Sequence, residues 1–150
     1  MTRTFSKVYG LASIRLGWCY THPDIVSVIG KIRSPFNVST AGQAAGVAAI
    51  KDTTHVEKII SHTAKWHSIA TQRLAGMGLE VTGTEGNFVC VGFPDKDGMR
   101  AKDCDSFLRD KNIITRYLAI FGLPNHLRIT IGREEEMELC LDAVEAFVKG

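Results

Sequence analysis

The segment Thr4–Trp18 places a hydroxyl, an amine and a guanidinium around a glycine turn. Ser6 and Lys7 come at the end of a predicted strand. Gly10 permits a sharp or positive-φ turn, and Arg15 begins a second apolar run. An amine can form a Schiff base with an aldehyde carbon, while a hydroxyl and a planar guanidinium can hold phosphate oxygens. The segment therefore predicts a site for a phosphorylated aldehyde.

Each of these three side chains also has an ordinary structural explanation. Lys7 could be a surface lysine, Ser6 could cap a turn, and Arg15 could be the partner in a surface ion pair. The spacing from Lys7 to Arg15 within one loop favours the Schiff-base interpretation, because the motif as a whole and not the lysine carries the signal.

The composition suits one compact unit, because 150 residues and 45% apolar content are ordinary for a single domain. Eighteen basic and 16 acidic side chains are mixed along the sequence, so there is no basic stripe to bind nucleic acid. The sequence also has no signal-peptide layout and no apolar run near membrane-spanning length. We expect a cytoplasmic protein with reduced thiols, no disulfide, no metal and no nucleic-acid or membrane partner. Its cysteines are Cys19, Cys90, Cys104 and Cys140.

The first third of the chain predicts two strands and two helices. One strand ends at Lys7 and the other covers Leu16–Tyr20, and both are apolar and short enough to be buried in a larger sheet. Asp24 is predicted to cap the first helix. The second helix, Ala41–Ile50, is rich in alanine and glycine, which permits close approach of two backbones, so we expect it to be buried.

A long helix is predicted next. Thr54 and Glu57 have the spacing of a capping box at its start, and Gly76 and Gly78 end it. A long helix with a narrow apolar stripe commonly runs between two parts of a protein. The stripe consists of Val56, Ile59, Ile60, Thr63, Ala70 and Leu74.

The remainder predicts an α+β unit. In its last strand Leu127 and Ile129 point to one side and Arg128 to the other, so Arg128 is expected to face a ligand. The closing helix begins with three glutamates, which suit the helix dipole. Strands are expected at residues 79–82, 88–93, 113–118 and 126–131, and helices at 100–111 and from 134, the latter with an apolar face of Met137, Cys140, Leu141, Val144, Phe147 and Val148.

Other candidate motifs are weak. His62 and His67 are five residues apart, which separates them by ~140° on a helix, so we expect solvated histidines and not metal ligands. Gly76-Met77-Gly78 lacks the third glycine of a dinucleotide fingerprint and is interpreted as a helix C-cap. The sequence contains no P-loop motif.

The sequence resembles the fold-type I, pyridoxal-phosphate-dependent aminotransferases, and within them the histidinol-phosphate aminotransferases. The resemblance covers nearly the whole chain, yet members of that family are more than twice as long, with a cofactor lysine well past the midpoint. The chain is therefore expected to be a C-terminal portion. The motifs that carry the resemblance are Ser6-Lys7 to Arg15, Pro35-Phe36-Asn37-Val38, Ala41-Gly42-Gln43-Ala44-Ala45, Glu85-Gly86-Asn87-Phe88-Val89, Ile114-Thr115-Arg116, Gly122-Leu123-Pro124 and Leu127-Arg128-Ile129-Thr130-Ile131-Gly132.

The resemblance implies an α/β fold comprising the end of the large-domain sheet and an α+β small domain joined by a long helix. Residues 1–52 would be a remnant of the large pyridoxal-phosphate-binding domain, residues 53–78 the interdomain helix, and residues 79–150 the small C-terminal domain. The implied assembly is a homodimer.

The resemblance also implies a role for each candidate residue. Lys7 would carry pyridoxal 5'-phosphate and move a proton, while Ser6 and Arg15 would bind the cofactor phosphate. Arg128 would grip the substrate α-carboxylate, with a solvated strand arginine as the alternative, and Arg116 would hold the distal phosphate. The implied reaction, a step of histidine biosynthesis, transfers the amino group of histidinol phosphate to 2-oxoglutarate and yields imidazole acetol phosphate and glutamate.

Two departures from the family pattern leave the amino donor open. Tyr117 follows Arg116 where the family usually has proline, and Ile120-Phe121 precede Gly122 where the family has a small residue and an aromatic one. An aromatic or other amino acid therefore remains an alternative donor.

A non-catalytic role is a second alternative. The family's partner for the pyridinium nitrogen and its other cofactor contacts come from sequence before the lysine, so we expect little or no transaminase activity from this polypeptide alone. It would then be a truncated domain that associates with itself or with another chain. Association would cover the apolar residues expected at its surface, which are Phe5, Leu11, Ile14, Leu16 and Trp18.

Overall fold

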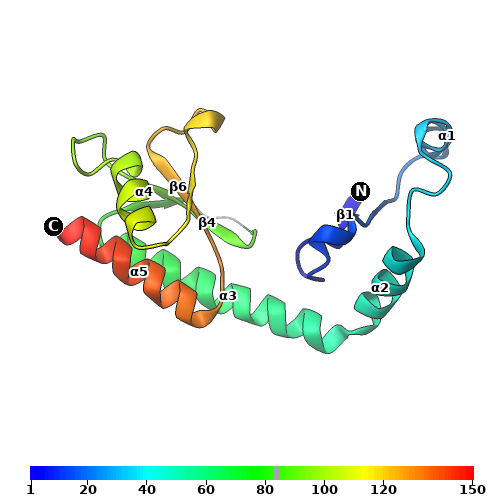
Figure 1. Ribbon diagram of the computed structural model, residues 1–150, viewed down its shortest axis with the longest axis horizontal. Helices are drawn as coiled ribbons and strands as arrows, with labels where there is room; N and C mark the ends of the chain where they lie inside the picture. Colours follow the sequence, from blue (N-terminus) through cyan, green and yellow to red (C-terminus); the bar gives the residue numbers. More distant parts are fainter. Residues whose placement is uncertain (83–84) are drawn as a thin grey trace. The chain divides into compact units, whose positions relative to one another are not determined.

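A computed structural model describes residues 1–82 and 85–150 of the chain. The chain divides into two compact units, Met1–Ser61 and His62–Gly150 (Figure 1). No helix within the described ranges is long and apolar enough to cross a membrane.

The first unit opens with a two-stranded antiparallel sheet. Strand β1 (Thr2–Thr4) pairs with β2 (Gly17–Cys19), with Arg3 opposite Trp18. Both strands are shorter than predicted and are exposed in this chain, so the expectation of buried strands is wrong for it. Within the described residues these strands pair only with each other, and no second layer covers them.

Most of the apolar residues in and between these strands are less exposed than expected. Phe5 is 5% exposed and its ring packs on Tyr9, with ring centroids 4.8 Å apart. Trp18 is exposed, as expected, whereas the remaining predicted surface residues, Leu11, Ile14 and Leu16, are half-buried.

Helix α1 (Pro23–Ile32) starts with a cap that differs from the predicted one. His22 is the N-cap, and its Nδ1 accepts a hydrogen bond of 3.3 Å from the Asp24 N–H. Pro23 then occupies the first turn, where its missing N–H costs nothing, so the helix begins before Asp24 can cap it.

Helix α2 (Thr40–Lys51) is capped by Ser39, whose Oγ accepts from the Gly42 N–H at 3.0 Å. Only Gly42 and Gly46 of this helix are buried, so the expected burial of the whole helix is wrong. The close approach is local: a methyl group on Gly46 would lie 2.5 Å from Leu16 Cδ2. Glycine therefore lets α2 contact the loop that follows β1.

Helix α3 (Thr53–Gly76) is the predicted long helix. Its N-terminal cap is Asp52, which accepts from the His55 N–H at 3.0 Å, and not the Thr54 box. Gly78 has a φ of +80° and ends the helix as predicted. Of the predicted stripe, Ala70 and Leu74 are fully buried, whereas Ile60 is exposed.

The second unit is built on a four-stranded antiparallel sheet of order β3-β4-β6-β5. Figure 1 shows helices α4 and α5 next to this sheet, within the same unit, and α5 ends at the C-terminus. The strands are β3 (Glu80–Thr82), β4 (Phe88–Gly92), β5 (Arg116–Tyr117) and β6 (His126–Thr130), and the helices are α4 (Ala101–Asp110), the short η2 (Ala119–Phe121) and α5 (Glu134–Lys149). The predicted elements of this region are thus confirmed, with ends moved by up to three residues.

One hydrophobic core joins α3, α4, α5 and the sheet. The predicted face of α5 is confirmed, because four of its six residues are buried and Phe147 and Val148 pack against the core. Burial raises the pKa of the Cys104 thiol to about 12 and that of Cys140 to about 11, so both stay protonated at neutral pH. The largest fully buried side chains are Trp66, Leu74, Leu108, Leu127, Met137 and Leu141.

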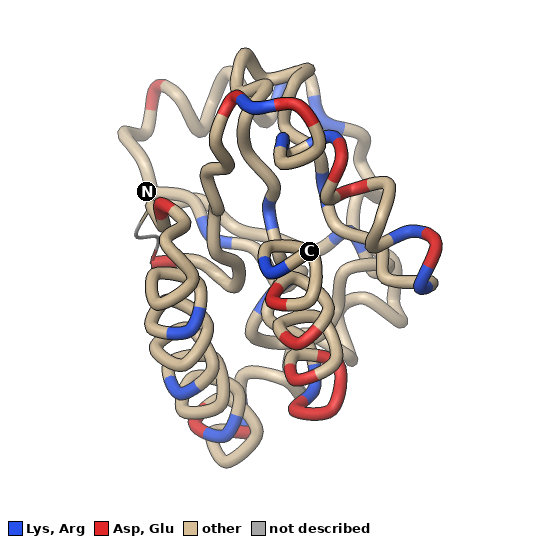
Figure 2. The backbone as a smooth tube through the Cα atoms, turned by 90° about the vertical axis from the view of Figure 1, so that its left-hand side faces the viewer, with Lys and Arg blue, Asp and Glu red and all other residues tan. Residues whose placement is uncertain are grey.

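An ion network on one side of this core connects α3 to α5. Arg73 donates to Glu138 at 2.9 Å, to Asp142 at 2.7 Å and to Glu145 at 3.2 Å. The acidic residues run along α5, as Figure 2 shows for the helix that ends at the C-terminus. Hydrogen bonds from Lys149 and Arg73 lower the pKa of Glu145.

Replacing Arg73 by methionine is expected to lower the free energy of unfolding by about 1–2 kcal/mol at neutral pH, because its guanidinium forms ion pairs with three carboxylates. Lys149 and then Arg73 depress the folded-state pKa of Glu145, so the part of the contribution that Arg73 makes through Glu145 is present above the ordinary glutamate pKa and is lost as pH falls through the lowered value. Urea unfolding at several pH values measures both effects. Lys65→Met, which removes the single exposed pair with Glu134, is the control and should cost less than about 0.5 kcal/mol.

Candidate functional site

The first group of predicted site residues lies in the loop between β1 and β2. The loop is closed at its base by the Phe5 N–H, which donates to the Leu16 carbonyl at 3.0 Å. The Gly10 N–H donates to the Lys7 carbonyl at 2.8 Å, and Gly10 has a φ of +68°. The predicted positive-φ turn is confirmed, and the two hydrogen bonds hold the backbone before and after Lys7.

Ser6 is held by a residue that the sequence interpretation did not single out. Thr4 Oγ1 donates to Ser6 Oγ at 2.9 Å and accepts from the Ser6 N–H at 3.0 Å. Because Ser6 Oγ receives a hydrogen bond from Thr4, its own hydrogen remains available for an external acceptor. The spacing of Thr4 two residues before Ser6 could have identified Thr4 as a hydrogen-bond partner of Ser6, because threonine side chains bond backbone groups two residues on.

Lys7 and Arg15 supply positive charge to the same loop. Lys7 is exposed, and its Nζ has no ion pair or hydrogen bond in the described part of the chain. Arg15 is also exposed, in a left-handed conformation (φ 57°), and its Nη1 donates to the Ala12 carbonyl at 2.9 Å. The guanidinium has five N–H donors, so most remain for a ligand.

These donors fit a phosphorylated aldehyde. Lys7 offers a free amine for an aldehyde carbon, and Ser6 and Arg15 offer hydroxyl and guanidinium donors for phosphate oxygens. All three belong to the unit Met1–Ser61.

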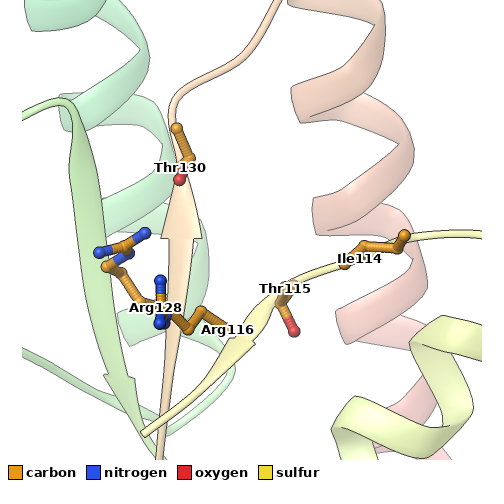
Figure 3. A pocket seen from close by; sticks show the side chains of 5 residues that line it. All are labelled: Ile114, Thr115, Arg116, Arg128 and Thr130. Atoms are coloured by element: carbon orange, nitrogen blue, oxygen red, sulfur yellow. The ribbon is translucent and has the colours of Figure 1, made fainter. Parts of the chain in front are cut away.

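The second group consists of two arginines in the unit His62–Gly150. Arg116 on β5 is paired directly with Arg128 on β6. Figure 3 shows their side chains extending to the same side of the two strands. They line a pocket of about 330 Å³ together with Ile114, Thr115 and Thr130. Arg128 therefore leaves the apolar layer as predicted, since its neighbours Leu127 and Ile129 are buried.

Aromatic rings, and not carboxylates, support the two guanidinium groups. Arg128 Cζ lies 5.1 Å from the centroid of Phe88, and Arg116 Cζ lies 5.4 Å from that of Phe121. Neither arginine has an ion pair among the described residues, and Arg128 Nε is buried with no hydrogen-bond partner there. Two like charges side by side with unused donors favour a ligand that carries carboxylate or phosphate oxygens.

Replacing Arg128 by methionine is expected to weaken the binding of inorganic phosphate to this pocket by roughly ten- to a hundredfold, because hydrogen bonds to a charged group contribute about 1.5–3 kcal/mol. Arg128→Lys keeps the charge without the planar fork and should show an intermediate loss. NMR titration of the Arg116 and Thr130 amides measures the affinity. Equal affinities for all three proteins would contradict an anion-binding role.

The two histidines of α3 are not solvated as expected. His62 Nε2 lies 2.8 Å from the Gly132 carbonyl oxygen. His67 is half-buried, and its Nε2 is buried without a hydrogen-bond partner in the described residues. The prediction was wrong because the second unit packs against more of α3 than the narrow apolar stripe indicated. Residues 1–82 and 85–150 contain no group of three His, Cys, Asp or Glu side chains that could hold a metal ion.

Comparison with known proteins identifies the family. The family model for aminotransferase class I and II matches residues 1–144. The chain therefore belongs to the class I and II aminotransferases, and the predicted family is confirmed.

Within this family, the chain is similar to histidinol-phosphate aminotransferases. It is 42% identical to that of Maricaulis maris over 149 residues, which are 99% of this chain and 41% of the relative. It is 45% identical to that of Rhodopseudomonas palustris (strain BisB18) over 148 residues, 99% of this chain and 40% of the relative. The chain thus spans about 40% of the length of the curated relatives it matches.

Solved structures give the same result for the fold. The histidinol-phosphate aminotransferase of Sinorhizobium meliloti, solved with pyridoxal-5'-phosphate, matches with a TM-score of 0.87 and 30% identity, covering 99% of this chain and 40% of that chain. A putative aminotransferase from Burkholderia pseudomallei matches with a TM-score of 0.88 and 32% identity, covering 98% and 44%. The predicted α/β fold of part of a fold-type I aminotransferase is confirmed.

Proposed function

We propose that this chain is part of a pyridoxal-phosphate-dependent aminotransferase that transfers the amino group of histidinol phosphate to 2-oxoglutarate, in histidine biosynthesis. The observation that carries the proposal is 42–45% identity to histidinol-phosphate aminotransferases over 99% of this chain. In this proposal residues 1–52 belong to the large cofactor-binding domain, residues 53–78 form the interdomain helix, and residues 79–150 form the small domain.

Three residues would hold the cofactor. Lys7 would bind it covalently through Nζ, while the Ser6 hydroxyl and the Arg15 guanidinium would donate to its phosphate. The free Nζ of Lys7 and the unused donors of Ser6 and Arg15 support this assignment. Bound pyridoxal phosphate supplies an electron sink for the carbanion at the substrate Cα.

The other residues would orient the substrate and move its proton. Arg128 would hold the α-carboxylate of 2-oxoglutarate and Arg116 the distal phosphate of histidinol phosphate, and the adjacent guanidinium groups are suited to both tasks. Lys7 Nζ, once released as a free amine, would take the proton from the substrate Cα as general base and deliver it as general acid.

The proposed assembly is a homodimer in the cytoplasm. Exposed apolar residues in the first unit support association, among them Phe36, which is 93% exposed, and the apolar side chains of α1. Light scattering of the purified chain tests this part of the proposal, and a stable monomer at high concentration would contradict it.

A chimera tests the activity. This chain replaces the matching 41% of the Maricaulis maris enzyme, and the chimera is expressed in a bacterium that lacks histidinol-phosphate aminotransferase. Growth without histidine is the expected result. A folded chimera that fails to support growth but transaminates phenylalanine or tyrosine would overturn the proposed donor and favour the aromatic alternative left open by Tyr117 and Phe121. The 150-residue polypeptide by itself is expected to show little or no turnover.

A further inference from the structure

Asp105 is a buried charged residue whose carboxylate contacts Thr115, the residue directly before Arg116. It lies on α4 and is only 8% exposed. Its Oδ2 accepts from Arg109 Nε at 2.7 Å, and its Oδ1 accepts from Thr115 Oγ1 at 3.0 Å. Both carboxylate oxygens are therefore used, which offsets the cost of removing the charge from water.

Thr115 interrupts the apolar side of the segment that leads into β5. Ile113 and Tyr117 pack against the core, whereas Ile114 and Arg116 are exposed. The alternation of an extended chain places Thr115 on the same inward side as Ile113 and Tyr117. On that side the Thr115 hydroxyl donates to the Asp105 carboxylate. The segment therefore has one polar contact, between the apolar contacts of Ile113 and Tyr117.

The pairing of β5 is short, and beyond its ladder the Leu118 N–H donates to the His126 carbonyl at 3.1 Å, so the pairing is held at the end that follows Tyr117. The strand has two residues at the edge of the sheet, and its ladder consists of Arg116 with Arg128 and Tyr117 with Leu127. A slip by one residue would turn every side chain to the opposite face. Arg116 would then leave the pocket and point toward the core.

The connection from α4 does not fix the other end of the strand, which precedes Arg116. Asn112 adopts a left-handed conformation (φ 60°), and the Ile113 N–H donates to the Leu108 carbonyl at 2.9 Å. These contacts hold the chain as far as Ile113. The next side-chain hydrogen bond in the described part of the chain is that of Thr115 to Asp105, directly before Arg116.

We propose that Asp105 is a positioning residue that fixes the register of β5 through Thr115 and so keeps Arg116 beside Arg128. A buried polar contact can select one pairing over alternatives even where an apolar pair would be equally stable. The importance of the register for binding an anionic substrate rests on the proposed function, because that function assigns the two arginines to the substrate.

Isosteric substitutions test the proposal in the full 150-residue chain. Thr115→Val removes the hydroxyl and keeps the shape, whereas Thr115→Ser keeps the hydroxyl. Cross-strand NMR contacts between Tyr117 and Leu127 report the register, and titration with inorganic phosphate reports the pocket. We expect Thr115→Val to lose these contacts and to bind phosphate about tenfold more weakly, and Thr115→Ser to match the unaltered chain.

The Asp105 variants add a second comparison. Asp105→Asn keeps an oxygen that accepts from Thr115 and should preserve the register, whereas Asp105→Leu should behave as Thr115→Val does. A folded Thr115→Val protein with unchanged contacts and affinity would overturn the proposal. Rapid solvent exchange of the Thr115 hydroxyl proton in the unaltered chain would also overturn it, and that measurement needs no variant.

The outcome is separable from that of the proposed function. Failure of the chimera to support growth would leave the Tyr117–Leu127 contacts and their response to Thr115→Val unchanged. Conversely, if Thr115→Val keeps the Tyr117–Leu127 contacts while the chimera supports growth, only the role of Asp105 is overturned. An unaltered chain that binds no phosphate would overturn the link between the register and anion binding.

Discussion

Replacing Lys7 by alanine in the chimera is expected to lower the transamination rate by about 10²–10⁴-fold, the usual contribution of a positioned general acid and base. Lys7 is exposed and its Nζ has no ion pair in the described residues, so the substitution removes no structural contact. The loss of rate should therefore occur without a change in the thermal stability of the cofactor-free protein. Initial rates with histidinol phosphate and 2-oxoglutarate, together with a melting curve, measure both quantities.

The same variant should lose the covalent cofactor label. Borohydride reduction in the presence of pyridoxal phosphate, followed by peptide mapping, is expected to label the peptide that contains Lys7. Lys31→Ala, which removes an exposed lysine of α1, is the matched control and should keep both label and activity. A label spread over several lysines, unchanged in Lys7→Ala, would show that Lys7 is not the cofactor lysine.

The elements that could be predicted from the sequence are those set by local spacing. The apolar period of α5, the glycines that end α3 and the alternation that turns Arg128 out of the core each depend on residues within a few positions of one another. The turn at Gly10 belongs to the same class, because a positive φ is a local property of glycine.

What could not be predicted depends on contacts between distant segments or on competing local caps. His22 and Asp52 cap the helices for which Asp24 and Thr54 were predicted. The rings of Phe88 and Phe121 reach the arginines only once the sheet and η2 have formed. The contact of Asp105 with Thr115 spans the end of α4 and the start of β5, and an aspartate in an exposed-looking helix gave no sign of it.

Trp66 is the most informative omission from the predicted stripe of α3. It is 1% exposed and is among the largest fully buried side chains of the second unit. Its position between Thr63 and Ala70 fits the helical period of the predicted stripe, which did not include it. Lys65 lies with its Nζ 5.4 Å from the Trp66 ring, so its charged end stays outside while the ring enters the core.

Trp66→Ala is expected to lower the free energy of unfolding by about 3–5 kcal/mol, through lost apolar burial and the cavity left behind. This loss is a large fraction of the ~5–15 kcal/mol by which native domains are stable. Trp66→Phe should cost much less, at most about 2 kcal/mol, because Trp66 Nε1 is buried without a hydrogen-bond partner in the described residues and its removal relieves that penalty. Urea unfolding followed by circular dichroism measures both variants. Equal losses for the two would contradict the expectation that the volume left behind sets the cost.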